Sequence, residues 1–154
     1  MTRESINASI NALIVCGPDL KYYYCSARYP GSVHDARVLR NSALHQLFEA
    51  GWRPFLSAII LGDSAYPCKD WLIPPIRMPR TEAENRFNAA HKSTRSVIEC
   101  SFGLIKNRFA VLATPLCVKS PDYACEIVKC CTALHNLCIQ FMRSSARRHS
   151  LSNQ

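Results

Sequence analysis

A short apolar run near the middle of the chain restricts the folds that this sequence can adopt. Residues 58–61 are Ala-Ile-Ile-Leu, and the turn Gly62-Asp63-Ser64 follows them directly. The run is short and rich in β-branched side chains, which favours a strand buried on both faces over a helix. Such a strand needs other elements to cover both of its faces. Residues 58–61 therefore predict the central strand of an α/β domain.

The segments on either side of this strand predict a hairpin, a helix and an irregular stretch. Residues 10–16 predict a buried strand, and residues 21–27 predict the strand that returns after a Gly-Pro-Asp turn. Apolar side chains at rough helical spacing predict a helix over residues 35–48. Residues 66–79 contain four prolines and are predicted to be irregular, with Trp71 and the two apolar residues after it packed on the core.

The second half of the chain predicts helices. From Ile98 to Phe109, apolar side chains recur at spacings of 4, 3 and 4 residues, which predicts a helix over residues 93–109. A shorter helix is predicted over residues 81–88. Ser120 as an N-cap and Pro121 at the first helical position predict the start of the last helix.

The size and composition are those of one globular domain. The chain has 154 residues, of which 48% are hydrophobic and 19% are charged. We predict a domain over residues 1–143 and a disordered polar tail over residues 144–154. No apolar stretch approaches the roughly 20 residues that cross a bilayer, and no apolar segment follows a basic N-terminus. We therefore expect no membrane contact and no secretory signal.

The charge balance suggests a polyanionic partner. The chain carries 19 Lys and Arg against 11 Asp and Glu, for a formal net charge of +8. A basic domain of this size attracts polyanions, and nucleic acid is the first candidate. Many basic proteins bind no nucleic acid, so the charge alone leaves both interpretations open.

The nine cysteines are scattered and odd in number, which is typical of reduced thiols in an intracellular protein. Cys131, His135 and Cys138 share one helical face, and with Cys125 and Cys130 they suggest a zinc site. Structural zinc sites usually show paired CxxC spacing, which this segment lacks. Packing of free cysteines in the core is the favoured alternative.

Three acidic residues are placed where a metal-dependent hydrolase needs them. Asp35 follows a turn at a predicted helix start, Asp63 ends the predicted central strand, and Glu99 lies on the predicted helix beside its apolar stripe. Cleavage of a phosphodiester by two metal ions needs several carboxylates around one point, and Mg²⁺ prefers such hard oxygen ligands. Each acid also has a structural interpretation, as a helix-dipole partner, a turn residue and an ion-pair partner, respectively.

Basic side chains surround Glu99 at helical spacing, and Gly103 leaves room beside its carboxylate. Such a face suits phosphate groups that approach a metal. The alternative is a solvent-exposed helix face with an ion pair between Arg95 and Glu99. The candidate contacts to DNA phosphates are Lys92, Arg95, Lys106 and Arg108.

Three segments, taken in order, resemble the DDE endonuclease domain of the PIF/Harbinger transposases and of the Harbinger transposase-derived nucleases. Residues 29–38 resemble the PGSxHD block of that family, and residues 61–67 resemble its GDSxYP block. Residues 85–109 resemble its last block, YNxxHxxxRxxIExxFGxxKxRF, and residues 133–136 resemble its late helix. The resemblance spans about residues 9–140.

This resemblance implies an α/β, RNase H-like fold in which helices flank a mixed sheet. It implies cleavage of DNA with Mg²⁺ or Mn²⁺, with Asp35, Asp63 and Glu99 as metal ligands and with Asp63 and Glu99 as catalytic residues. It also implies two partners, DNA and a separate helix-turn-helix (Myb-like) DNA-binding protein. The implied location is the nucleus, with the cytoplasm as a second one.

The sequence departs from the family at its start. The first catalytic aspartate of the family lies on an earlier strand, and this chain has no equivalent, so we predict that the first strand is missing and that cleavage is impaired. Gly17 stands where many members carry an aspartate. The neighbours of a missing strand expose backbone and apolar surface. The alternative is a catalytically inactive, domesticated remnant that binds DNA or a protein.

Overall fold

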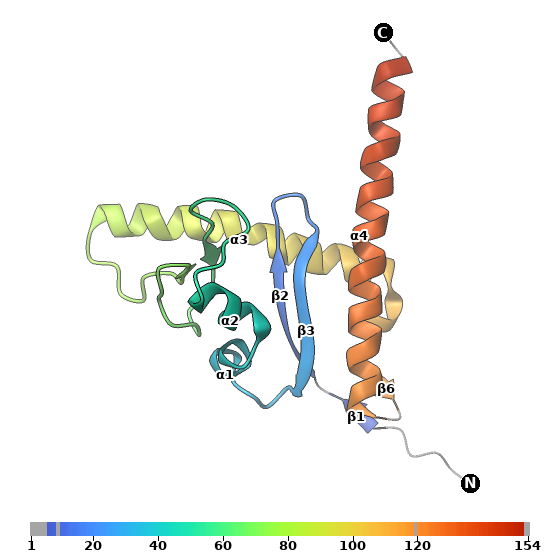
Figure 1. Ribbon diagram of the computed structural model, residues 1–154, viewed down its shortest axis with the longest axis horizontal. Helices are drawn as coiled ribbons and strands as arrows, with labels where there is room; N and C mark the ends of the chain where they lie inside the picture. The colour runs from blue at the N-terminus through green and yellow to red at the C-terminus, as the bar shows by residue number, and fades with distance from the viewer. Residues whose placement is uncertain (1–5, 9, 119, 153–154) are drawn as a thin grey trace.

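The fold is mixed α/β, as the sequence predicts (Figure 1). The computed structural model describes residues 6–8, 10–118 and 120–152. Its strands are β1 (Ile6–Ala8), β2 (Ile10–Cys16), β3 (Tyr22–Pro30), β4 (Ile60–Leu61), β5 (Leu72–Ile73) and β6 (Leu116–Val118). Its helices are α1 (Asp35–Arg40), α2 (Ala43–Glu49), α3 (Glu82–Arg108), the short 3-10 helix η1 (Ala110–Leu112) and α4 (Pro121–Ser152).

The described strands pair in three separate two-stranded sheets. β2 and β3 form the predicted antiparallel hairpin, in which Leu13 lies opposite Ser26. β4 pairs in parallel with β5, with Ile60 opposite Leu72, and β1 pairs antiparallel with β6. The sequence predicted one mixed sheet. Instead, β2 and β4 are not hydrogen-bonded to each other, and no described strand joins them.

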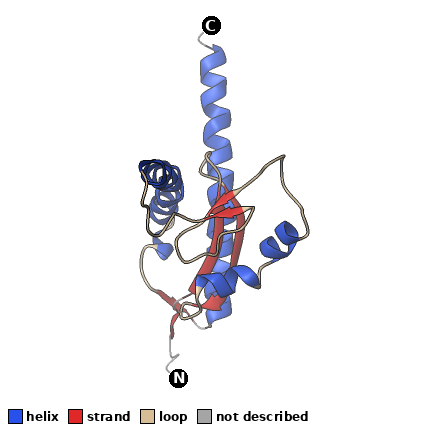
Figure 2. Ribbon diagram, turned by 90° about the vertical axis from the view of Figure 1, so that its left-hand side faces the viewer, coloured by secondary structure: helices blue, strands red, loops and turns tan. Residues whose placement is uncertain are grey.

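Helices pack on the hairpin from several sides (Figures 1 and 2). α4 packs against β3, whereas α1 and α3 contact β2. The larger core cluster joins the hairpin to α1 and α2 and includes Phe48 and Trp71. The smaller cluster joins the hairpin to α3 and α4 through Tyr22, Ile105 and Cys131. Trp71 is 1% exposed, which confirms it as the predicted core anchor of the irregular stretch.

Local capping divides the helix that was predicted over residues 35–48. The Oγ atom of Ser42 accepts a hydrogen bond from the N–H of His45 at 3.1 Å, and this N-cap starts α2. The structure therefore has two short helices, α1 and α2, in place of the single predicted one.

A capping box also explains why α3 is longer than predicted. The Thr81 side chain accepts a hydrogen bond from the N–H of Glu84, and the Glu84 carboxylate accepts one from the N–H of Thr81. The helix starts directly after this box and continues without a break. The helices predicted over residues 81–88 and 93–109 are thus one helix.

α4 begins where the sequence predicts and ends later. Ser120 accepts a hydrogen bond from the N–H of Tyr123 at 3.3 Å, as an N-cap does. The helix continues to Ser152, so the structure is helical where a disordered tail was predicted, and no Gly or Pro interrupts residues 122–152. Its C-terminal part extends beyond the rest of the fold (Figure 1). No helix in the described ranges combines the length and apolarity that a membrane span requires.

Two consecutive side chains of α4 hold the hairpin beside its turn. Asn136 Oδ1 accepts a hydrogen bond from the N–H of Tyr22, and Asn136 Nδ2 donates one to the Tyr22 carbonyl, both at 2.8 Å. His135 Nε2 lies 2.9 Å from the carbonyl oxygen of Leu20, a residue with a left-handed φ of 64°. The Asn136 amide thus pairs with the start of β3 as another strand would, and it fixes the hairpin against α4.

We predict that Asn136→Ala lowers the free energy of unfolding by about 2–4 kcal/mol, because the N–H and C=O groups of the buried Tyr22 both lose their partner. Urea denaturation followed by circular dichroism measures this loss. The matched control is Gln140→Ala, an exposed position one turn later on α4, which should change the free energy by less than about 0.5 kcal/mol. Equal losses in the two variants would contradict the prediction.

Candidate active site

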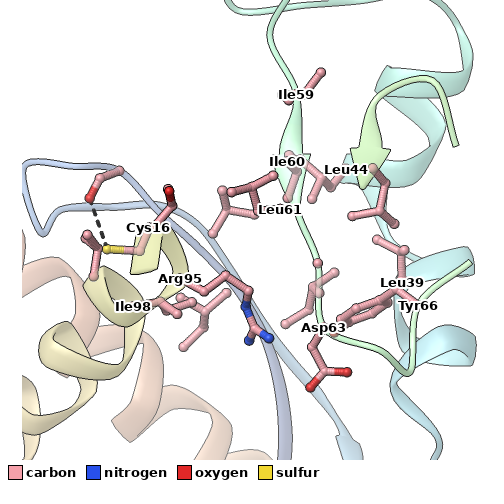
Figure 3. A pocket seen from close by; sticks show the side chains of 18 of the residues that line it. Cys16, Leu39, Leu44, Ile59, Ile60, Leu61, Asp63, Tyr66, Arg95 and Ile98 are labelled. Carbon is pink, nitrogen blue, oxygen red and sulfur yellow. Dashed lines mark hydrogen bonds between the residues drawn. The ribbon is translucent and has the colours of Figure 1, made fainter. Parts of the chain in front are cut away.

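A pocket of about 470 Å³ opens between β2 and β4 (Figure 3). Residues 12–18 line it on the β2 side, and residues 59–63 line it on the β4 side. Further lining residues come from α1, α2, α3 and β5. Figure 3 shows the side chains of Asp63 and Arg95 together at one end of the pocket. Two of the three predicted acids, Asp35 and Asp63, belong to its lining.

Asp35 is the first residue of α1, and an amide from β2 orients its side chain. Asn11 Nδ2 donates to Asp35 Oδ1 at 2.6 Å and also lies 2.8 Å from the Val33 carbonyl oxygen. These bonds fix the carboxylate at the edge of the pocket. Asn11 was not among the site residues predicted from the sequence. The signal was available, because Asn11 is a polar residue inside an otherwise apolar strand.

Asp63 follows β4 directly, and its own turn holds its side chain. Asp63 Oδ1 accepts a hydrogen bond from the N–H of Ala65 at 2.6 Å. This is the turn geometry that the structural interpretation of Asp63 predicted. Asp63 Oδ2 makes no hydrogen bond to any residue that the structure describes. The turn therefore orients the carboxylate while one oxygen stays available to a ligand in the pocket.

Both acids lie close enough to Tyr66 to affect its pKa. Burial, followed by the negative charges of Asp35 and Asp63, raises the pKa of the Tyr66 phenol to about 12, and Arg95 opposes this rise. The same four side chains line the pocket. The pocket thus combines two carboxylates, a guanidinium and a phenol that stays protonated at neutral pH.

Glu99 lies outside this group. It is exposed on α3 and is not among the residues that line the pocket, although Arg95, one turn earlier, is. Within the described ranges, no group of three or more His, Cys, Asp and Glu side chains is placed to hold a metal ion. The donor chemistry of Asp35 and Asp63 fits a hard divalent cation, but only these two of the three predicted ligands converge.

The four basic residues that were predicted near DNA fall into three different settings. Lys92 and Lys106 are exposed on α3, whereas Arg95 is half-buried in the pocket. Arg108 turns toward α4, where its Nη1 lies 3.0 Å from Nδ1 of His135. Through this contact Arg108 joins α3 to α4. It lies nine residues after Glu99, which places it on the opposite side of α3 from that acid.

In the cysteine-rich segment of α4, Cys125 and Cys131 are buried, Cys138 is half-buried and Cys130 is exposed. His135 is fully buried, and both of its ring nitrogens lie within 3.0 Å of a partner, Arg108 and the Leu20 carbonyl. Burial raises the pKa of the Cys125 and Cys131 thiols, which favours the neutral thiol over the thiolate that binds zinc. These contacts support the core-packing interpretation of the segment.

The chain resembles known proteins over most of its length. Residues 3–136 match the family model described as DDE superfamily endonuclease, which makes this an endonuclease-type domain. The chain is 36% identical over 134 residues to "Putative nuclease HARBI1" of Homo sapiens, and 36% identical to the same protein of Bos taurus. It is 27% identical over 160 residues to "Protein ALP1-like" of Arabidopsis thaliana. The chain therefore belongs to the DDE superfamily endonucleases and is homologous to the Harbinger-derived nucleases.

The matched relatives are much longer than this chain. The alignment with the human relative covers 86% of this chain and 38% of the relative, and the Arabidopsis alignment covers 96% and 39%. No solved structure matches the chain. Endonucleases of this superfamily generally use divalent metal ions.

We predict that Asp35→Asn and Asp63→Asn each lower the pKa of Tyr66 from about 12, because each removes a negative charge that opposes phenolate formation. The pKa stays above the ordinary value of 10, because burial is the largest cause of the shift. NMR titration of ¹³Cζ-labelled tyrosine measures it, with Tyr66→Phe for assignment. Asp70→Asn, at an exposed acid outside the pocket, is the control and should leave the Tyr66 pKa unchanged.

The raised pKa of Tyr66 also determines the pH range in which this residue contributes to the stability of the protein. The pKa of Tyr66 is higher in the folded protein than its ordinary value of 10. Its contribution to stability is therefore complete below pH 10 and is lost as the pH rises toward about 12. Tyr66→Phe should accordingly flatten the fall in the free energy of unfolding over this alkaline range. An unchanged slope would contradict the assignment.

Proposed function

We propose that this chain carries a metal-dependent DNA endonuclease site, in which Asp35 and Asp63 hold a divalent ion, Mg²⁺ or Mn²⁺. The observation that carries the proposal is the convergence of these two carboxylates on one pocket beside Arg95, in a chain of the DDE endonuclease family. A bound divalent ion supplies an activated water and stabilises the oxygen that leaves during phosphodiester hydrolysis.

The side chains of the pocket have distinct parts in this proposal. Asn11 holds Asp35 in place, and the turn at Ala65 holds Asp63, so both carboxylates are oriented before a ligand arrives. Arg95 supplies positive charge beside them, which suits a phosphate oxygen of DNA. Tyr66 stays protonated at neutral pH and so can donate a hydrogen bond without adding negative charge.

We propose further that cleavage by this chain is weak. Asp35 and Asp63 are the only acidic residues in the described lining of the pocket. Glu99 has to move in from the exposed side of α3 before it can join them. A two-metal mechanism needs more carboxylate oxygens than two side chains provide.

A second candidate function is DNA binding without cleavage, as in a domesticated remnant. The exposed position of Glu99, away from the other two acids, favours it. The exposed Lys92 and Lys106 lie on the same side of α3 as Glu99, and the formal net charge of +8 adds long-range attraction for DNA. As in the family, we propose a nuclear location and a separate Myb-like DNA-binding partner for either function.

Nicking of supercoiled plasmid DNA in Mn²⁺ tests the first function. We expect slow nicking that Asp35→Ala and Asp63→Ala each reduce by about 100-fold or more, since each removes a proposed metal ligand. Glu82→Ala, an exposed acid in the first turn of α3, is the matched control and should nick at the unaltered rate. No nicking by the unaltered chain supports the second function. Nicking that persists in Asp63→Ala indicates a contaminating nuclease and removes support for the site.

Fluorescence anisotropy with a labelled DNA duplex tests the basic face of α3. We predict that the double variant Lys92→Ala, Lys106→Ala binds DNA more weakly and that the slope of log affinity against log salt falls by about 2, one unit for each lost phosphate contact. Arg86→Ala is the control on the same helix, because Arg86 forms an ion pair with Glu82 at 3.9 Å. Equal losses of DNA affinity in the double variant and in Arg86→Ala would show that the attraction for DNA is not localised on this face of α3.

A further inference from the structure

The backbone on both sides of Asp63 is hydrogen-bonded to the end of β5 and to the loop that follows it. The N–H of Gly62, directly before Asp63, donates to the Ile73 carbonyl at 3.0 Å. Arg77 Nη2 donates to the carbonyl of Ser64, directly after Asp63, at 2.9 Å. The position of the Asp63 turn therefore depends on where this part of the chain lies.

This part of the chain, residues 73–77, is the linking segment. Pro74 and Pro75 lie near its start. Proline fixes its own φ and has no N–H, so the strand pairing of β5 does not continue past Ile73. The prolines make the segment stiff but leave it without a strand partner, so side chains from another element have to hold it.

Two side chains from one turn of α3 hold the linking segment. Asn88 Oδ1 accepts a hydrogen bond from the N–H of Ile76, and Asn88 Nδ2 donates one to the Ile76 carbonyl, both at 2.9 Å. His91 Nε2 lies 3.0 Å from the carbonyl oxygen of Ile73, which also accepts from the Gly62 N–H. A carbonyl oxygen only accepts, so Nε2 is the ring nitrogen that carries the proton. The linking segment is thus fixed to α3 at two points.

The same face of α3 carries Arg95. Asn88, His91 and Arg95 follow one another at spacings of three and four residues, which places them on one side of the helix. Arg95 lines the pocket and lies beside Asp63 at one end of it (Figure 3). One helix therefore sets both charged groups: Arg95 directly, and Asp63 through the linking segment.

We propose that three side chains are positioning residues for the candidate active site: Arg77, Asn88 and His91. Through them, α3 fixes the Asp63 carboxylate relative to the Arg95 guanidinium. The inference rests on the proposed function, because it takes Asp63 as a metal ligand. Contacts of this kind orient the side chains that hold a metal ion, and their loss typically lowers metal affinity by about 10- to 100-fold.

A role in packing alone fits these contacts less well. Arg77 and Ser64 are exposed, and so is Ile76, so water competes for their hydrogen bonds. Such bonds contribute little to the stability of a whole domain. The contacts meet instead at the backbone groups next to Asp63. They are therefore concentrated where a carboxylate needs a fixed direction.

Amide hydrogen exchange followed by NMR tests this network in the full chain, without DNA or metal. The reporter is the N–H of Ala65, which donates to Asp63 Oδ1 in the turn. In Arg77→Met we expect this amide to exchange at least about tenfold faster while amides of the β2–β3 hairpin keep their rates, because only the turn loosens. Arg77→Lys keeps a donor and should restore most of the protection. Arg80→Met, at an exposed arginine of the same loop, is the matched control and should change neither rate.

The α3 side of the network is tested with the same reporter. Asn88→Ala removes both hydrogen bonds to Ile76 and should also speed exchange of the Ala65 amide by at least about tenfold. Asn85→Ala, an exposed position one turn earlier on α3, is the matched control and should have no effect. His91→Leu should act like Asn88→Ala, whereas His91→Gln keeps an N–H donor and should retain part of the protection.

Two outcomes would overturn the proposal. One is unchanged exchange of the Ala65 amide in both Arg77→Met and Asn88→Ala. The other is equal acceleration in the β2–β3 hairpin, which would show a loss of general stability and not a loosened turn. Because Arg77 is exposed, its variants should fold even if the variants of the buried His91 do not, so the comparison of Arg77→Met with Arg77→Lys still decides.

Mn²⁺ binding, measured by electron paramagnetic resonance without DNA, separates this inference from the proposed function. If both hold, Arg77→Met weakens Mn²⁺ binding by about tenfold and Arg77→Lys restores it. If the unaltered chain binds no Mn²⁺ and nicks no plasmid, the proposed function fails, and faster Ala65 exchange in Arg77→Met still supports the positioning of the turn from α3. If the unaltered chain nicks plasmid and Arg77→Met binds Mn²⁺ equally well, the positioning role fails and the proposed function stands.

Discussion

The hydrogen bonds from α4 to the β2–β3 hairpin are the contact on which the rest of the structure depends. Asn136 pairs with both backbone groups of Tyr22, and His135 lies against the Leu20 carbonyl at the turn. A hairpin of two strands is marginally stable alone, so it needs such support from a helix. Once β2 is fixed, Asn11 is fixed as well, and through it the carboxylate of Asp35. A contact at the far end of the chain thus positions one half of the candidate site.

The other half of the site depends on a different part of the core. Trp71 and the parallel pair of β4 and β5 place Asp63 at the end of β4, on the opposite side of the pocket from β2. The two acids therefore belong to two substructures that share helices but no strand pairing. This division accounts for both properties of the pocket: its acids converge at one end, and its walls are open strand edges.

Local sequence signals predicted the elements that local chemistry controls. The strand over residues 10–16, the Ser120 cap of α4 and the buried Trp71 all follow from patterns within a few residues. The prediction was less successful where short-range competition mattered. The hydroxyl of Ser42 divided one predicted helix into two, and the capping box at Thr81 joined two predicted helices into one. The pairing of β1 with β6 joins segments about 110 residues apart, so no local pattern could indicate it.

The sequence by itself determined the mixed α/β class, the family and the chemical identity of the candidate acids, because apolar periodicity and ordered motifs are properties of the chain alone. Only the tertiary structure decided which of these acids line the same pocket. Asp35 and Asp63 reach one pocket, whereas Glu99 lies on the exposed side of α3. It also decided that Arg108 serves the packing of α3 on α4. The physical reason is that spacing along a helix sets which side chains share a face, but only packing against other elements determines which way that face points.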